Sequence, residues 1–209
     1  MMFDIKNEIK SAFTENKVAI YVSVAILFAS IILGYFLHPY LHGYLNPVVD
    51  DLTQKVQTGV IRLTFADIFL NNIRVVFSMF IFGLVFCISA VILSFNGFFT
   101  GYYVANADNL VQTLLLIIPH GIFEFSSCII ACASGFVLFG FLCKFLKTLL
   151  KQENNSVLEK LNNSLEASFD KLKQAFILLV IASVLMAIAG FFEVYLTLPI
   201  ANLILSLFG

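Results

Sequence analysis

The sequence predicts an all-α fold, a polytopic transmembrane helix bundle with about five crossings. Of the 209 residues, 60% are hydrophobic and only 12% are charged, whereas soluble domains contain about 45–50% apolar and about 25% charged residues. The apolar residues come in several nearly unbroken runs of about 20 residues, the length that a helix needs to cross a bilayer. These observations exclude a soluble globular domain, and we expect a single membrane domain over residues 1–209.

The amino-terminal residues are expected to lie at the membrane surface, ahead of the first crossing. Residues 1–17 place apolar side chains among lysines at helical spacing, which is typical of an interfacial amphipathic helix. Residues 18–37 carry no charge and are long enough to cross. Residues 38–72 then contain several charged side chains and the helix breakers Pro39, Gly43 and Pro47, so we expect an exposed segment there.

The middle of the chain is harder to divide into helices. Residues 74–95 form the expected second crossing, and Asn96-Gly97 is predicted to end it as a turn. Residues 98–118 are apolar but are interrupted by Asn106, Asp108 and other polar residues. We therefore expect short or broken helices near 97–119, which either cross the membrane or form a re-entrant hairpin.

The carboxyl-terminal half contains two further crossings, at residues 121–141 and 175–195. Residues 144–174 between them are predicted to form an amphipathic helix outside the membrane. Apolar residues recur in that segment at heptad-like spacing, at Val157, Leu161, Leu165, Phe169 and Leu172. Residues 196–208, interrupted by Pro199, are expected to form a short or broken helix.

The positions of the lysines and arginines favour one orientation in the cell membrane. Three basic residues precede the first crossing and six lie between Lys144 and Lys173, and such residues collect on the cytoplasmic side. If the amino terminus and residues 144–174 are both cytoplasmic, an even number of crossings separates them, so residues 98–118 must cross. The carboxyl terminus and residues 38–72 are then extracytoplasmic. A re-entrant hairpin at 98–118 would leave only three crossings before residues 144–174. It would then place the six lysines of that segment outside the cell.

Two acidic residues, Glu124 and Glu193, lie inside apolar runs. Ionisable residues at membrane depth are costly, and their default interpretation is functional. His120 and Glu124, four residues apart, share one helical face, which could line a binding or conducting site. The alternative is a packing seam, because the same face continues through small residues that let helices approach closely: Ser127, Ala131 and Gly135.

Other chemistry has little support in the sequence. His120 and Glu124 lack the H-E-x-x-H spacing of a zinc protease, so we expect no metal site. No catalytic motif or glycine-rich phosphate loop is present, so we expect no enzyme activity and no cofactor. A formal net charge of −1 gives no basic field for nucleic acid.

Three blocks of residues resemble the stage II sporulation protein M family. They are Phe69-Leu70-Asn71-Asn72-Ile73-Arg74, Asn96-Gly97-Phe98-Phe99-Thr100-Gly101 and Pro119-His120-Gly121-Ile122-Phe123-Glu124. The resemblance covers essentially the whole chain and implies a multi-span membrane protein. In spore formers it implies an anchor that assembles with cell-wall hydrolases during engulfment. Many relatives occur in prokaryotes that make no spores, and we expect this chain to be one of those.

Two functions from different classes therefore remain. The first is a non-enzymatic membrane scaffold or anchor, whose partners are the lipid bilayer, other membrane proteins or a second copy of the chain. The alternative is a transporter, or a protein that handles lipids or small solutes. Its cavity would be lined by the polar residues His120, Glu124, Glu193, Asn72, Arg74 and Asn96 and shaped by Gly97, Gly101, Pro119 and Gly121.

Overall fold

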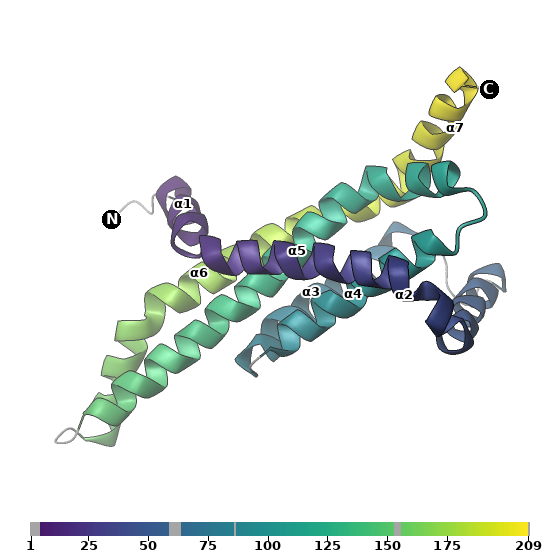
Figure 1. The fold of residues 1–209 in the computed structure, drawn as a ribbon. Helices are drawn as coiled ribbons and strands as arrows, with labels where there is room; N and C mark the ends of the chain where they lie inside the picture. Colours follow the sequence, from purple (N-terminus) through teal and green to yellow (C-terminus); the bar gives the residue numbers. More distant parts are fainter. Residues whose placement is uncertain (1–4, 59–63, 86, 153–155, 209) are drawn as a thin grey trace.

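The protein is helical throughout the residues that its computed structural model describes, 5–58, 64–85, 87–152 and 156–208 (Figure 1). The helices are α1 (Ile5–Glu15), α2 (Lys17–Gln57), α3 (Phe65–Ile81), α4 (Ile88–Ala105), α5 (Leu110–Lys151), α6 (Val157–Phe191) and α7 (Thr197–Phe208). A short helical turn, Phe82–Leu84, follows α3, and a π-helical turn, Phe192–Leu196, joins α6 to α7. The predicted all-α class and the short carboxyl-terminal helix are confirmed.

Five helical segments of the described chain are long and apolar enough to cross a membrane. They are α2 up to Pro47, α3 with the turn that follows it, α4, α5, and α6 continued by α7. Figure 1 shows α5 and α6 as a long antiparallel pair, with α3 and α4 running beside it. The predicted number of crossings is confirmed.

The predicted boundaries of the second and third crossings are wrong. The chain turns between α3 and α4 and again at 106–109, so the predicted span 74–95 is divided between α3 and α4. The predicted turn at Asn96-Gly97 lies inside α4, because the glycine is used for packing: a Cβ atom at Gly97 would lie 2.9 Å from the carbonyl oxygen of Leu27. Residues 98–118 end α4 and begin α5 rather than forming a hairpin of their own.

The first turn occurs where the sequence gives little polar signal. It contains Gly83 and Cys87, and Cys87 has a φ of 67°, in the left-handed region that side chains other than glycine rarely adopt. This backbone conformation starts α4, which then runs antiparallel to α3.

The prolines predicted to break helices are accommodated inside them. Pro39 and Pro47 lie within α2 and Pro119 lies within α5. Proline removes one backbone hydrogen bond and bends a helix without ending it when the neighbouring turns are held, and Figure 1 shows α2 changing direction towards its carboxyl-terminal end. Much of the predicted exposed segment 38–72 is therefore helical.

Residues 144–174 form the tip of the α5–α6 hairpin rather than one separate helix. Helix α5 continues to Lys151, and α6 begins at Val157 after a capping box in which Ser156 and Glu159 exchange hydrogen bonds between side chain and backbone. Figure 1 shows this tip at the opposite end of the α5–α6 pair from the carboxyl terminus.

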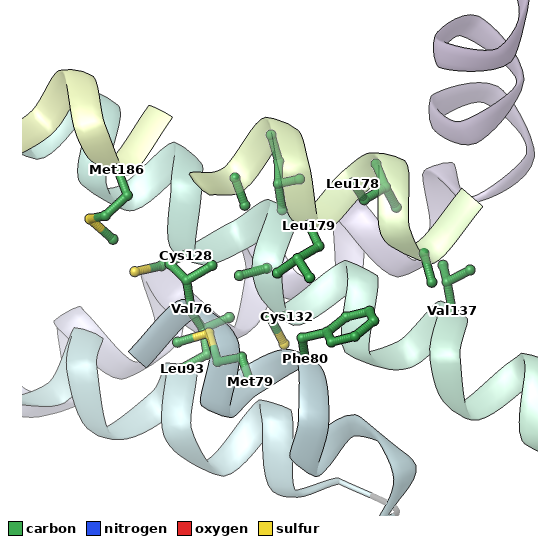
Figure 2. Close-up of a cluster of buried hydrophobic side chains, with 14 of the residues drawn as sticks. Val76, Met79, Phe80, Leu93, Cys128, Cys132, Val137, Leu178, Leu179 and Met186 are labelled. Atoms are coloured by element: carbon green, nitrogen blue, oxygen red, sulfur yellow. The ribbon is translucent and has the colours of Figure 1, made fainter. Parts of the chain in front are cut away.

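The buried core lies between α5 and its neighbours (Figure 2). Its apolar side chains come from α3, α4, α5 and α6, among them Val76, Met79, Leu93, Cys132, Leu178 and Met186. Small residues bring the backbones close: a Cβ atom at Gly135 would lie 2.5 Å from the carbonyl oxygen of Met79. Across the α5–α6 contact, the Ser127 hydroxyl donates a 2.6 Å hydrogen bond to the carbonyl of Ala182. The bundle is thus held by close backbone packing, as expected in lipid.

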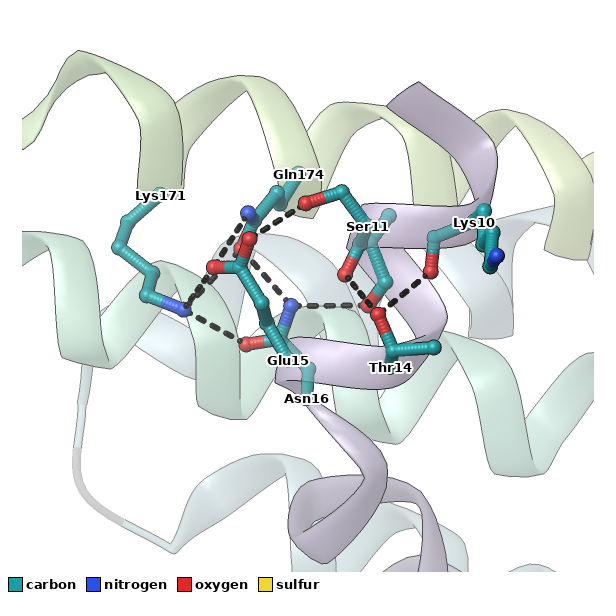
Figure 3. A network of polar contacts seen from close by, with 8 residues as sticks. Lys10, Ser11, Thr14, Glu15, Asn16, Lys171 and Gln174 are labelled. Carbon is teal, nitrogen blue, oxygen red and sulfur yellow. Dashed lines mark hydrogen bonds and ion pairs between the residues drawn. The ribbon is translucent and has the colours of Figure 1, made fainter. Parts of the chain in front are cut away.

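Helix α1 is fastened to α6 by a polar network (Figure 3). The buried side chain of Gln174 accepts hydrogen bonds from Asn16 at 2.9 Å and Lys171 at 3.0 Å, and donates one to Glu15 at 2.8 Å. Lys173 forms an ion pair with Glu8. Helix α1 and residues 171–174 of α6 therefore lie on the same side of the bundle.

Candidate functional site

The candidate site begins on α5, where His120 and Glu124 occupy one face, one turn apart. Pro119 does not end the helix, so both residues lie inside α5, more than two turns after its start at Leu110. The Nδ1 atom of His120 lies 3.3 Å from the hydroxyl oxygen of Thr197. This contact joins α5 to the start of α7.

Glu193 lies in the π-helical turn between α6 and α7. The wider turn is closed by Thr197, whose hydroxyl donates a 3.0 Å hydrogen bond to the carbonyl of Phe192. The ring of Phe192 packs on Phe123 of α5, with 4.8 Å between ring centroids. Single π turns are rare and occur frequently at functional sites, and this one turns Thr197 towards His120.

The two acids, Glu124 and Glu193, lie on the elements that the His120–Thr197 and Phe123–Phe192 contacts bring together. Both side chains are half-buried. Within the described part of the chain, neither carboxylate accepts a hydrogen bond or forms an ion pair. Two neighbouring carboxylates without protein partners can bind a cation or exchange a proton, but the described residues contain no group of three ligands that could hold a metal ion.

A third helix reaches the same region through Asn96 of α4. Its amide nitrogen lies 4.0 Å from the sulfur of Cys128, one turn after Glu124 on α5. Three of the predicted polar residues, His120, Glu124 and Glu193, therefore lie where α5 meets the α6–α7 junction, and Asn96 of α4 contacts α5 one turn further along.

The two polar residues predicted on α3 do not join this cluster. Arg74 is exposed and Asn72 half-buried, and among the described residues neither forms a hydrogen bond or ion pair with the acids. Arg74 therefore pairs with neither Glu124 nor Glu193 in this part of the structure. Its side chain points away from the bundle, on the opposite side of α3 from buried Val76 and Met79.

Arg74 also lies near the middle of Phe65–Leu84, a segment long and apolar enough to cross a membrane. Phe69, five residues earlier, packs near Gly190 of α6, and Phe80, six residues later, packs against Phe176 with ring centroids 5.2 Å apart. At a rise of 1.5 Å per residue, Arg74 is about 8 Å and about 9 Å from these two levels. A charge near the centre of a membrane helix costs about 2.5–3.5 kcal/mol, so an exposed arginine at this depth requires a partner outside the chain or a path to polar surroundings.

The motif glycines act in packing rather than at the acids. A Cβ atom at Gly101 would overlap the carbonyl oxygen of Ile31, so this glycine lets α4 touch α2. Gly121, next to His120, has only ordinary contacts. Thr197 and the π turn were missed by sequence reasoning, because only Pro199 marks that part of the sequence as irregular.

Comparison with known proteins places the chain in a family. The family model described as Stage II sporulation protein M matches residues 23–198. An uncharacterized protein of Methanocaldococcus jannaschii is 32% identical over 151 residues, covering 70% of this chain and 78% of its own. A second uncharacterized protein of that archaeon is 28% identical over 98% of this chain and 92% of its own.

No solved structure matches the chain. The family model nevertheless covers most of the sequence, and the two relatives come from an archaeon, as expected for a member outside the spore formers. The chain, with its five helical segments able to cross a membrane, belongs to the stage II sporulation protein M family of membrane proteins.

Proposed function

We propose that this protein is a membrane anchor, without turnover of its own, that holds partner proteins at the cytoplasmic surface through the tip of its α5–α6 hairpin. The observation that carries the proposal is an apolar stripe on α6 that the described chain leaves substantially exposed. Leu161, Leu165 and Phe169 are 37%, 45% and 58% exposed. The side of α6 that packs on α5 here consists of small residues, including buried Ser164 and Ser168.

The position of this stripe distinguishes it from a lipid-facing surface. Helix α1 contacts α6 at residues 171–174, and α6 extends about 20 Å beyond that contact to its start at Val157. Charged residues alternate with the stripe along this stretch, including exposed Glu166 and Asp170. An apolar surface bordered by polar residues, outside the membrane, is typical of a protein-binding site.

The lysines support a cytoplasmic location for the hairpin tip. Six of them lie between Lys144 and Lys173, and three more precede or begin α2. Because α1 and residues 171–174 lie on one side, both groups follow the positive-inside rule with the same orientation. With five crossings, this proposed orientation implies a carboxyl terminus outside the cell.

Site-specific cross-linking tests the anchor proposal. A photo-reactive amino acid at position 165, on the stripe, is expected to cross-link the chain to a discrete protein in intact cells. The matched control carries the same amino acid at position 170, on the polar side of α6. Equal products from both positions, or none from position 165, would overturn the proposal.

The unpartnered acids favour a second candidate function, cation or proton transport through the Glu124–Glu193 region. Its test is proton flux into proteoliposomes under an imposed pH gradient. Transport predicts a measurable flux that Glu124→Gln abolishes and that Glu166→Gln, a carboxylate removed from the hairpin tip, leaves intact. Flux that is absent, or unchanged in Glu124→Gln, would rule out this role.

A further inference from the structure

We propose that the outward face of α3 binds a transmembrane helix of another protein, one that carries a carboxylate near the middle of the bilayer. This inference rests on the anchor function proposed above and identifies a second contact surface, inside the membrane.

The outward face of α3 is defined by Leu70, Arg74, Phe77 and Ile81. These residues follow one another at spacings of four, three and four, which keeps them on one side of a helix. The three apolar members are 51%, 44% and 55% exposed, and Arg74 at their centre is exposed too. The result is an apolar helix surface with a single positive charge in its middle.

No acid in the described part of the chain forms an ion pair with Arg74. Glu124 and Glu193 lie where α5 meets the α6–α7 junction and do not pair with Arg74. Asp67 is on α3 itself, but it is about 10 Å away along the axis and is held by Thr64 at the start of the helix, at 2.7 Å.

The depth of Arg74 in the bilayer limits which groups can pair with its positive charge. The levels of Phe69 and Phe80 bracket it on both sides within the membrane-spanning part of α3. Buried or membrane-depth charges are stable when they are paired, and a carboxylate on a neighbouring helix supplies both the opposite charge and the hydrogen-bond acceptors for the guanidinium. Leu70, Phe77 and Ile81 supply the surrounding apolar contact.

A second copy of the chain fits this face poorly. Two copies in one membrane share the same orientation, so a two-fold contact through α3 would place the two Arg74 side chains at the same depth and against each other. The carboxylate that would pair with Arg74 is therefore expected on a different protein and not on a second copy of this chain.

A defined peptide tests the inference without knowledge of the natural partner. The full-length protein, labelled with a fluorescent donor, is reconstituted in phosphatidylcholine vesicles with an acceptor-labelled transmembrane peptide of leucine and alanine. One peptide has an aspartate at its centre and its match has an asparagine. Energy transfer is expected to show roughly tenfold tighter association of the aspartate peptide.

Variants of the protein test whether the preference for the aspartate peptide depends on the outward face of α3. Arg74→Leu is expected to abolish it, and Arg74→Glu to transfer it to a peptide with a central lysine. The control Lys147→Leu removes a positive charge from the hairpin and should leave the preference unchanged. Thermal melting in detergent verifies that the variants fold.

Three results would overturn the inference: equal association of the two peptides, a preference that survives Arg74→Leu, or self-association of the chain that Arg74→Leu abolishes. Loss of the preference when phosphatidylglycerol is added would assign Arg74 to lipid phosphates and overturn it as well. If the peptide test fails while cross-linking at position 165 succeeds, the α3 surface is wrong and the anchor function stands.

Discussion

The contact between α1 and α6 gives the sharpest stability prediction, because its hydrogen bonds are defined. Gln174→Ala removes the acceptor for Asn16 and Lys171 and the donor to Glu15. Leaving buried partners unsatisfied costs about 1–3 kcal/mol. Lys171 and Glu15 are 31% and 51% exposed, so water compensates part of this loss, and we expect the lower part of that range, about 1–2 kcal/mol.

Hydrogen–deuterium exchange of the protein in lipid nanodiscs measures this loss directly. A destabilisation of about 1–2 kcal/mol increases the open population of α1 about 5- to 30-fold, and its amides should exchange faster by the same factor. Amides in the middle of α5 should be unaffected. Asp170→Asn, on the polar side of α6, is the matched control. Unchanged exchange in Gln174→Ala, or equal acceleration in the control, would refute the reasoning.

The same contact predicts a pH dependence. Hydrogen bonds from Ser11 and Gln174, with Lys171 nearby, hold the pKa of Glu15 below its ordinary value of 4.5. A lowered pKa in the folded state means that the carboxylate stabilises the contact fully above pH 4.5 and loses this effect as the pH falls through the lower, folded-state pKa. Exchange of α1 should therefore accelerate on acidification below pH 4.5 in the wild type, and less so in Glu15→Gln.

The packing of the bundle gives two further predictions, each with a control on the same type of residue. Gly101→Val should force α4 away from α2 and lower thermal stability in detergent by about 1–3 kcal/mol. The control Gly140→Val should not lower stability in this way, because a Cβ atom at Gly140 meets nothing within 4 Å. Equal melting temperatures of the two variants would contradict the α2–α4 contact. Ser127→Ala should cost about 0.6 kcal/mol, and at most about 1.7, because it breaks a bond to α6. Ser126→Ala breaks only a bond within α5 and should be close to neutral in the same unfolding assay.

The sequence predicts those features of the fold that depend on composition and on the lengths of the apolar runs. Five crossings follow from the lengths of the apolar runs and the positions of the lysines. The boundaries do not, because a turn signal such as Asn96-Gly97 also suits a helix that needs a glycine for close packing. The turn between α3 and α4 depends on the left-handed conformation of Cys87, for which cysteine gives no sequence signal.

The acids of the candidate site could be predicted from the sequence, but the backbone geometry and helix contacts that bring them together could not. Glu124 and Glu193 are identified by their charge inside apolar runs, and their proximity depends on how α5 packs on α6. The π turn and the contact between His120 and Thr197 arise from local backbone geometry near Pro199. The outward position of Arg74 follows from which side of α3 faces α5 and α6, which the sequence of α3 alone does not determine.

The size of the assembly that contains the chain in its own membrane tests the anchor proposal most directly. Native electrophoresis after extraction in a mild detergent is expected to show the 23.3 kDa chain in a complex with other proteins. Leu161→Ser with Leu165→Ser should release it from that complex, and Asp170→Asn should not. A wild-type chain that migrates alone, or a complex that survives the double substitution, would contradict the account.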